Sequence, residues 1–109
     1  MMRRADHLQG ALELVILKSL EHKANHGFGI TLHVQTVSGG LLRMEEGSLY
    51  PALHRMERGK LVKGEWRVTE NGRKARIYTL TSAGRKRLEE AEFNWTSAAK
   101  GVQKLLRFA

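Results

Sequence analysis

Residues 45–59, EEGSLYPALHRMERG, are the stretch from which the rest of the fold can be worked out. Leu49, Leu53 and Met56 recur at i, i+4 and i+7, which places one apolar stripe along a helix. The opposite side carries hydrogen-bonding and cationic groups and almost no acid: Ser48, Pro51, His54, Arg55 and Arg58, with Tyr50 on its flank. Such a helix can dock by its stripe and present the other face to an anionic partner. We therefore predict a DNA recognition helix.

Two apolar segments precede this helix and are expected to support it. Leu8–Glu21 is predicted to be a core helix that ends near residues 22–25. Its apolar residues are Leu8, Leu12, Leu14, Val15, Ile16, Leu17 and Leu20. Gly29–Val37 is predicted to be a second helix, although its β-branched residues leave a strand possible. Ser38-Gly39-Gly40 then breaks the chain, which gives the layout of a helix-turn-helix.

The sequence after residue 59 predicts a β-hairpin. Val62–Val68 alternates as a half-buried strand does, with Val62, Gly64, Trp66 and Val68 on one face. Residues 69–72, TENG, supply the turn, and Arg73–Leu80 returns as the second strand. A hairpin after a helix-turn-helix is a wing. Its cations are suited to grip phosphates, and they are Arg73, Lys74 and Arg76. An ordinary antiparallel ribbon with basic side chains is the other interpretation.

The last element is predicted to be a long helix. Thr81 is its expected N-cap, with Ser82 as the other candidate, and the helix should run to about Leu106. Two apolar series recur along it every seven residues: Leu88, Trp95 and Val102, and Ala91, Ala98 and Leu105. A helix of about 25 residues is about 37 Å long, which so small a domain cannot bury. We predict that this seam pairs with a second copy in a homodimer, while part of the helix packs on the chain's own first helix.

Composition limits the possible classes of protein. A chain of 109 residues suits one domain with a modest core, and it has no cysteine for disulfides or thiolate metal sites. No apolar run is long enough to span a bilayer, so no membrane partner is expected. The segment behind the N-terminal arginines contains Glu13 and Lys18, which argues against a signal peptide. We therefore expect a cytoplasmic protein.

The net charge of +8 is concentrated in one part of the chain. Residues 55–87 contain eleven Lys and Arg against three acids, so this span carries the whole net charge. A basic block beside a polar helix face is the electrostatic pattern of a nucleic-acid binder. A solvated charged surface is the alternative, but such surfaces mix the two signs more evenly.

Other classes of protein are less consistent with the sequence. A metal sensor would have to use His22, His26 and His33, with no acid or cysteine to complete the set. No nucleophile–base pair, phosphate-cradling loop or carboxylate pair set among apolar residues indicates an enzyme, and no cofactor is expected. A basic RNA-binding protein is the main rival, because charge alone does not separate the two nucleic acids. A protein–protein adaptor would leave the basic block unused.

Several of these motifs together resemble the PadR family of bacterial transcriptional regulators. The similar residues are GSLYPALHRME (47–57), Trp66, GRKARIYTLT (72–81), Gly84, and residues 8–20 with HGFG (26–29). The resemblance implies a mainly α fold with a small β-hairpin: a winged helix-turn-helix plus a long C-terminal dimerisation helix. It implies a homodimeric repressor that occupies double-stranded operator DNA. Residues 1–80 would form the DNA-binding part and residues 81–109 the dimerisation helix, as in the shorter members of the family.

The resemblance also implies roles for individual residues. Those on the DNA-facing helix are Ser48, Tyr50, Pro51, His54 and Arg55, and those on the wing are Arg73, Lys74 and Arg76. From the residues alone the recognition helix should begin at Pro51, because proline disfavours helix before it, but the resemblance implies a start near Glu46. At the end of that helix, Lys60 stands where the family usually has glycine. The helix should therefore stop one residue early, or Lys60 should be strained.

Trp95 has two interpretations. In some short family members a tryptophan at the corresponding place faces its symmetry mate and lines a site for flat aromatic ligands. A small aromatic effector bound there could change the spacing of the two wings and release DNA. The other interpretation is an aromatic side chain packed in the dimer seam.

Overall fold

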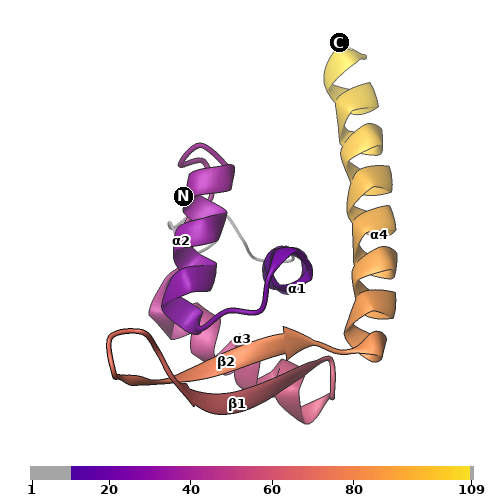
Figure 1. The fold of residues 1–109 in the computed structure, drawn as a ribbon. Coiled ribbons are helices and arrows are strands. Elements are labelled where there is room, and N and C mark those ends of the chain that lie inside the picture. The colour runs from indigo at the N-terminus through magenta and orange to yellow at the C-terminus, as the bar shows by residue number, and fades with distance from the viewer. Residues whose placement is uncertain (1–10, 109) are drawn as a thin grey trace.

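The computed structural model describes residues 11–108, which fold into a helical body with a hairpin at its base and one long helix that extends beyond the body (Figure 1). The elements are α1 (Leu12–His22), α2 (Gly27–Val37), α3 (Glu46–Arg58), β1 (Val62–Val68), β2 (Lys74–Leu80) and α4 (Ser82–Arg107). This order confirms the predicted winged helix-turn-helix with a long C-terminal helix. Leu8, which was expected in the first helix, lies outside the described residues.

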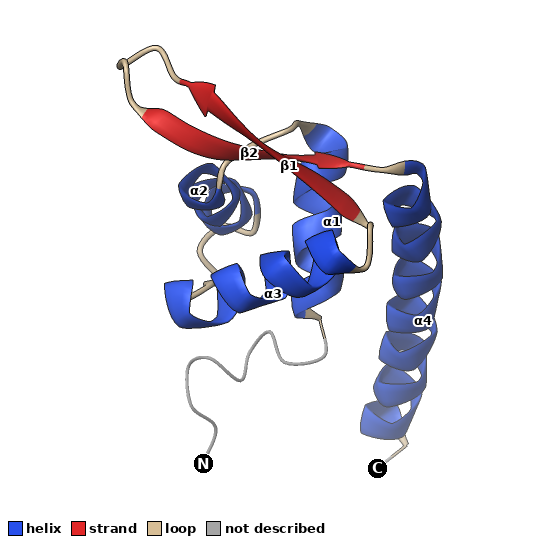
Figure 2. Cartoon of the chain, turned by 90° about the horizontal axis from the view of Figure 1, so that it is seen from below, coloured by secondary structure: helices blue, strands red, loops and turns tan. Residues whose placement is uncertain are grey.

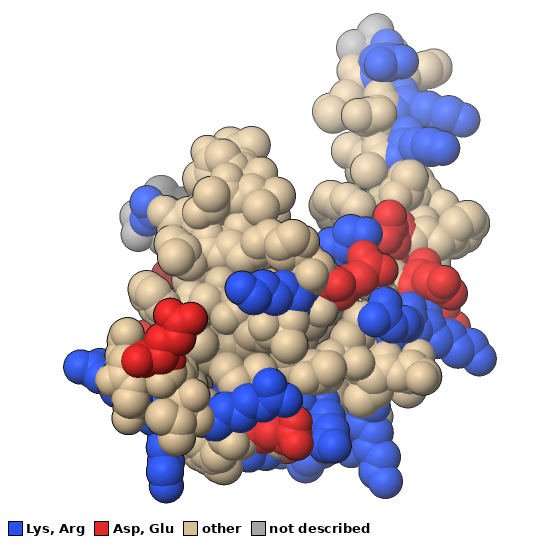
Figure 3. Space-filling model, in the orientation of Figure 1, with Lys and Arg blue, Asp and Glu red and all other residues tan. Residues whose placement is uncertain are grey.

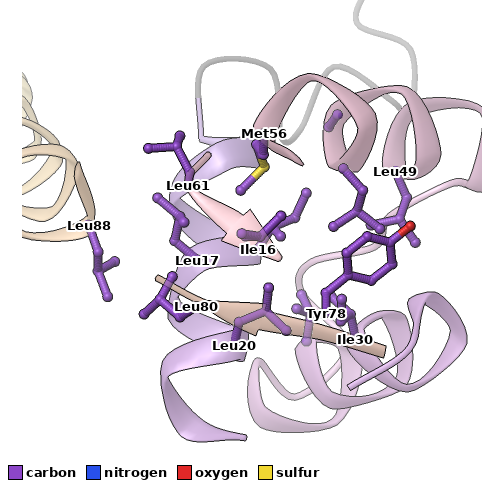
Figure 4. Close-up of a cluster of buried hydrophobic side chains, with 14 of the residues drawn as sticks. Ile16, Leu17, Leu20, Ile30, Leu49, Met56, Leu61, Tyr78, Leu80 and Leu88 are labelled. Atoms are coloured by element: carbon purple, nitrogen blue, oxygen red, sulfur yellow. The ribbon is translucent and has the colours of Figure 1, made fainter. Parts of the chain in front are cut away.

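One apolar core joins all the elements (Figure 4). The predicted stripe of α3, which consists of Leu49, Leu53 and Met56, is buried, as are Ile16 and Leu17 of α1. The other buried side chains of the cluster include Leu20, Ile30, Val34, Met44, Ala52, Leu61, Val62, Tyr78, Leu80 and Leu88. Because every element contributes at least one buried side chain, the core fixes α3 and the hairpin relative to one another.

Residues 27–37 form a helix and not a strand. His26 caps α2, because its Nδ1 accepts a hydrogen bond of 3.0 Å from the backbone N–H of Gly29. The predicted break follows α2, where Gly39 and Gly40 have φ values of 65° and 82°. Glycine adopts this conformation without steric cost, so the chain can turn sharply toward α3.

The helix α3 begins at Glu46, as the resemblance implied, and the start at Pro51 expected from the residues alone was wrong. The N–H groups of Ser48 and Leu49 bond to the carbonyl of Glu45 at 2.9 Å, which sets the first turn before the proline is reached. Pro51 then omits only the bond to Gly47, which is an exposed residue that water can reach. Tertiary packing of the stripe therefore outweighs the local preference.

The end of α3 shows the second of the two alternatives expected there, a strained Lys60, and not an earlier stop. The helix ends at Arg58, its C-cap Gly59 has a φ of −79°, and Lys60 is the only non-glycine residue with positive φ (62°) within residues 11–108. The N–H of Leu61 bonds to the carbonyl of Met56 at 2.9 Å, and that of Lys60 to Glu57 at 3.0 Å. These two bonds define a Schellman motif, in which glycine is the preferred residue at the position of Lys60.

We therefore expect Lys60→Gly to raise the free energy of unfolding by about 0.5–1 kcal/mol. The left-handed conformation strains a residue with a Cβ, and relief of that strain exceeds the added flexibility of glycine in the unfolded chain. Urea unfolding measures the change. Lys60→Ala is the control, since it removes the same charge and keeps a Cβ. An equal gain in Lys60→Ala would assign the effect to charge.

The hairpin has the predicted strands but not the predicted burial. Its register pairs Val62 with Leu80 and Val68 with Lys74, and the N–H of Tyr78 also bonds to the carbonyl of Asn25 at 2.9 Å. Only the inner end is covered: Val62 is buried, whereas Trp66 and Val68 are 65% and 67% exposed. The half-buried strand is therefore corrected to a strand buried at one end, because the hairpin extends past the helices that could cover it (Figure 1).

The N-terminal part of α4 is fixed to the body. The hydroxyl of Thr81 caps the helix by accepting a 3.0 Å bond from the N–H of Gly84. Arg87 pairs with Glu13 of α1 at 2.9 Å, and Lys18 of α1 lies 3.6 Å from Glu92. The expected packing of this helix on the chain's own first helix is thus confirmed for its N-terminal part. None of the described helices is long and apolar enough to cross a membrane.

Candidate nucleic-acid interface

The outer face of α3 presents most of the residues predicted for it. Pro51, His54, Arg55 and Arg58 are exposed, and Ser48 is half-buried. Tyr50 lies on the flank, where its hydroxyl approaches α2 so closely that a Cβ added at Gly27 would be 2.6 Å from it. Tyr50 therefore also packs α3 against α2, which the sequence alone did not indicate.

Exposed cations of α3 and the hairpin lie along the base of the molecule. Figure 3 shows Lys and Arg side chains projecting from this edge, beneath the hairpin and α3. Within the described chain, no carboxylate lies within 4.0 Å of five of them: Arg55, Arg58, Lys60, Arg73 and Lys74. Their charge is therefore available to an anionic ligand.

Arg76 differs from the other predicted wing cations. Its guanidinium is 2.5 Å from the carboxylate of Glu57 on α3, and its Cζ lies 5.6 Å from the ring centroid of Trp66. Both partners of the ion pair are about one-third exposed, at 32% and 31%. The structure therefore places Arg76 between the wing and α3, and not among the free cations.

Figure 2 shows α2 between α3 and the outer part of the hairpin. Side chains from the start of α2, the flank of α3 and the hairpin line a groove there. Its volume is about 860 Å³, and its lining contains Arg73, Lys74 and Arg76 but no acidic residue. Three exposed aromatic side chains, Phe28, Tyr50 and Trp66, also line it. Sequence reasoning gave Phe28 and Trp66 no role in binding, although aromatic residues near a run of cations were the available signal. The groove adds an apolar and cationic surface next to the outer face of α3.

The three histidines considered for a metal site do not come together in the structure as a group of three. His26 caps α2, and the rings of His22 and His33 stack with their centroids 4.8 Å apart. Within residues 11–108, no group of three or more His, Cys, Asp and Glu side chains lies close enough together to hold a metal ion.

The predicted seam of α4 is mostly exposed in the single chain. Trp95, Ala98, Val102 and Leu105 are exposed and Ala91 is half-buried. Leu88 is 2% exposed, because it packs into the core of its own chain. This corrects its assignment to a partner surface, for which it has no area left. Sequence reasoning did not include three further exposed apolar residues of this region, Phe93, Leu106 and Phe108.

Comparison with known proteins agrees with this architecture. The model of the PadR-like family of transcriptional regulators matches residues 16–90. A transcriptional regulator of Mycobacterium tuberculosis is 39% identical over 82 residues, which are 75% of this chain and 73% of that protein. A PadR-like regulator from Bacillus cereus is 29% identical with a TM-score of 0.80, covering 95% of this chain and 99% of that one. A regulator from Clostridium thermocellum shares the fold at 23% identity, with a TM-score of 0.81 and coverage of 91% and 96%.

The match spans the helix-turn-helix, the hairpin and the start of α4, so it includes every element that positions the basic face. It also confirms that the chain is a regulator and not an enzyme, because members of this family regulate transcription. The chain belongs to the PadR-like family of transcriptional regulators.

Proposed function

We propose that this regulator is a repressor that binds a pseudo-palindromic operator in double-stranded DNA as a homodimer in the cytoplasm. The observation that carries the proposal is a set of five cations on α3 and the hairpin that have no carboxylate partner among the described residues. Arg55, Arg58 and Lys60 come from α3 and its end, Arg73 and Lys74 come from the hairpin, and no carboxylate within residues 11–108 pairs with them. A helix of 13 residues with an exposed polar face has the size that the major groove admits.

Residues 1–80 would bind DNA, and residues 81–109 would join the two copies. The exposed apolar seam of α4 supports this division, because an apolar surface rimmed by charge marks an interaction site. The surface that we propose for the partner consists of Ala91, Trp95, Ala98, Val102 and Leu105. Two copies joined in this way present two α3 helices to half-sites about 34 Å apart.

Different residues of the basic face would have different roles. Ser48 and His54 would contact base edges, and Arg55 would bind a guanine or a phosphate. Tyr50, which precedes Pro51 in the sequence, would position the helix on the DNA through its hydroxyl. Arg58, Arg73 and Lys74 would neutralise phosphates and supply most of the affinity, which therefore falls steeply with salt.

Selection from a pool of random DNA duplexes tests the proposal. Recovered duplexes should share two half-sites related by two-fold symmetry, and single-stranded RNA of matched length should compete poorly. Equal competition by RNA would support an RNA-binding protein. Enrichment of a single, unsymmetrical site would contradict the homodimer.

Two substitutions separate affinity from sequence preference. Arg73→Ala should weaken binding to all duplexes alike and reduce the slope of log K against log salt by about 0.9 for each copy in the dimer. His54→Ala should instead change the preferred base at one position of each half-site, by roughly tenfold in relative affinity. Anisotropy titrations on the selected site, single-base variants of it and an unrelated duplex measure both effects. Uniform loss in both variants would show that the assigned roles are wrong.

We also propose that a planar aromatic effector stacks on Trp95 and releases the DNA. Trp95 lines an open groove of about 970 Å³ between α1 and α4, together with Phe93 and Leu14. The protein has two tryptophans, so titration of a Trp66→Phe variant with planar hydrophobic compounds reports on Trp95 alone. Saturable quenching of this variant is expected, together with loss of DNA binding by the wild type, in which Trp66 still stacks on Arg76. No quenching across a broad panel would leave Trp95 with only a packing role in the dimer seam.

A further inference from the structure

We propose that Arg76 is a positioning residue: by binding Glu57 it fixes the wing relative to the recognition helix and neutralises an acid that would otherwise repel DNA. This inference rests on the proposed DNA binding. It assigns Arg76 a task different from that of Arg73 and Lys74. It also explains why Glu57, Trp66 and Gly64 all lie next to the Arg76 side chain.

The ion pair joins two elements that must act together. Arg76 lies in the middle of β2, Glu57 lies in the last turn of α3, and their side chains are 2.5 Å apart. The other ion pairs of the described residues involve side chains that are 39–69% exposed, whereas these two are only 32% and 31% exposed. Water and salt therefore screen this pair less than a surface pair.

The guanidinium is confined by its neighbours in the hairpin. Trp66 is the direct cross-strand partner of Arg76, and its ring centroid lies 5.6 Å from Cζ. On the other side a Cβ added at Gly64 would be 2.8 Å from Nε of Arg76, so the absence of a side chain at Gly64 makes room for it. The planar guanidinium suits both the stacking and the ion pair, which a lysine ammonium does not reproduce.

Tyr78, a buried residue of β2, lies next to the same pair. Burial raises the pKa of Tyr78 above its ordinary value, and the charge of Glu57 raises it further, while Arg76 lowers it. Tyr78 is thus a neutral group beside the ion pair, and Arg76 remains the cation that compensates Glu57. The pair, the ring and Tyr78 form one connection between the hairpin and α3.

Glu57 explains why the basic face needs this connection. It lies on α3 between the exposed residues His54 and Arg58, with which it lines a small hollow on the surface. An unpaired carboxylate there would face the phosphates that approach Arg58 and the hairpin cations. Arg76 removes this repulsion and holds the hairpin at a fixed distance from α3.

A double-mutant cycle tests the proposal: Arg76→Gln, Glu57→Gln, both changes together, and Lys74→Gln as the control for a phosphate contact. Arg76→Gln should weaken binding to the selected duplex by roughly tenfold, because Glu57 is left unpaired, and leave the salt slope unchanged. Adding Glu57→Gln should restore affinity to within about threefold of the wild type. Lys74→Gln should reduce the slope by about 0.9 per copy, and Glu57→Gln should not rescue it.

One combination of results would overturn the proposal. If Arg76→Gln reduces the salt slope as Lys74→Gln does, and Glu57→Gln gives no rescue, Arg76 binds phosphate and the proposal is overturned. Arg76→Lys should recover only part of the affinity, because it keeps the charge without the planar geometry.

Thermal unfolding of the same proteins separates this proposal from the proposed function. The decreases in melting temperature of the two single variants should add up to more than the decrease of the double variant. This coupling does not depend on DNA. Coupling without DNA binding by the wild type would reject the function and keep the link between Arg76 and Glu57. Additive effects on the melting temperature would reject the link itself.

Discussion

A variant with both Val102→Glu and Leu105→Glu is expected to be a folded monomer that no longer binds a two-fold operator. Both side chains lie on the part of α4 that the chain's own core does not cover, and they are 54% and 76% exposed. Their replacement should therefore change the stability of the helix-turn-helix body by no more than about 0.5 kcal/mol. In the paired seam, however, the two changes place four carboxylates among apolar side chains, which is strongly unfavourable.

The loss of operator binding should be large. Once one half of a dimer is bound, the second half meets its half-site at a high effective concentration, which raises the overall affinity by about 10²–10⁴-fold. A monomer loses this gain and retains only the affinity of a single half-site. Sedimentation equilibrium measures the mass, and anisotropy with full-site and half-site duplexes measures the two affinities. The variant should bind both duplexes equally weakly.

Lys104→Glu provides a matched control. It changes the net charge of the chain by the same two units, but residue 104 lies outside the two heptad series of the seam. This variant should remain dimeric and bind the full site with nearly the affinity of the wild type. A dimer that survives Val102→Glu with Leu105→Glu would show that the two copies meet through another surface.

The features predicted best from the sequence are those that depend on neighbouring residues. The stripe of Leu49, Leu53 and Met56 and the N-cap at Thr81 are such features, and the structure confirms them. A helical period or a cap is encoded within a few positions, so a single sequence contains the whole signal. The two strands of the hairpin were predicted for the same reason, since a short turn joins them in the sequence.

What covers each face could not be predicted, because a period shows which side is apolar and not what lies against it. Leu88 has the same heptad position as Trp95, yet the core of its own chain covers Leu88. Trp66 has the alternation of a buried strand residue, yet its side chain is 65% exposed. The pairing of Arg76 with Glu57 joins residues 19 apart, and in a sequence with 19 Lys and Arg no local rule selects that partner.

Gly84→Ala is expected to destabilise the protein by about 2–3 kcal/mol or more and to displace α4. Gly84 is buried where the first turn of α4 lies against Leu61, in the segment between α3 and β1, and an added Cβ would lie 2.1 Å from the carbonyl oxygen of Leu61. That oxygen belongs to the backbone, which is fixed by its bond from the N–H of Thr81 at 3.1 Å. The only available response is for α4 to move away, which also withdraws Leu88 from the core.

Gly101→Ala is the control, because Gly101 lies in the same helix and an added Cβ there meets nothing within 4 Å. Alanine is the better helix former, so this variant should gain about 0.5–1 kcal/mol in urea unfolding if the new methyl group stays clear of the partner helix. A Gly84→Ala protein as stable as Gly101→Ala would mean that α4 can shift freely on the body. The distance between the two recognition helices would then not be set by the contact at Gly84. If Gly84→Ala is destabilising as expected, the contact at Gly84 holds α4 in one position on the body, and in the proposed homodimer it would help to set the distance between the two α3 helices.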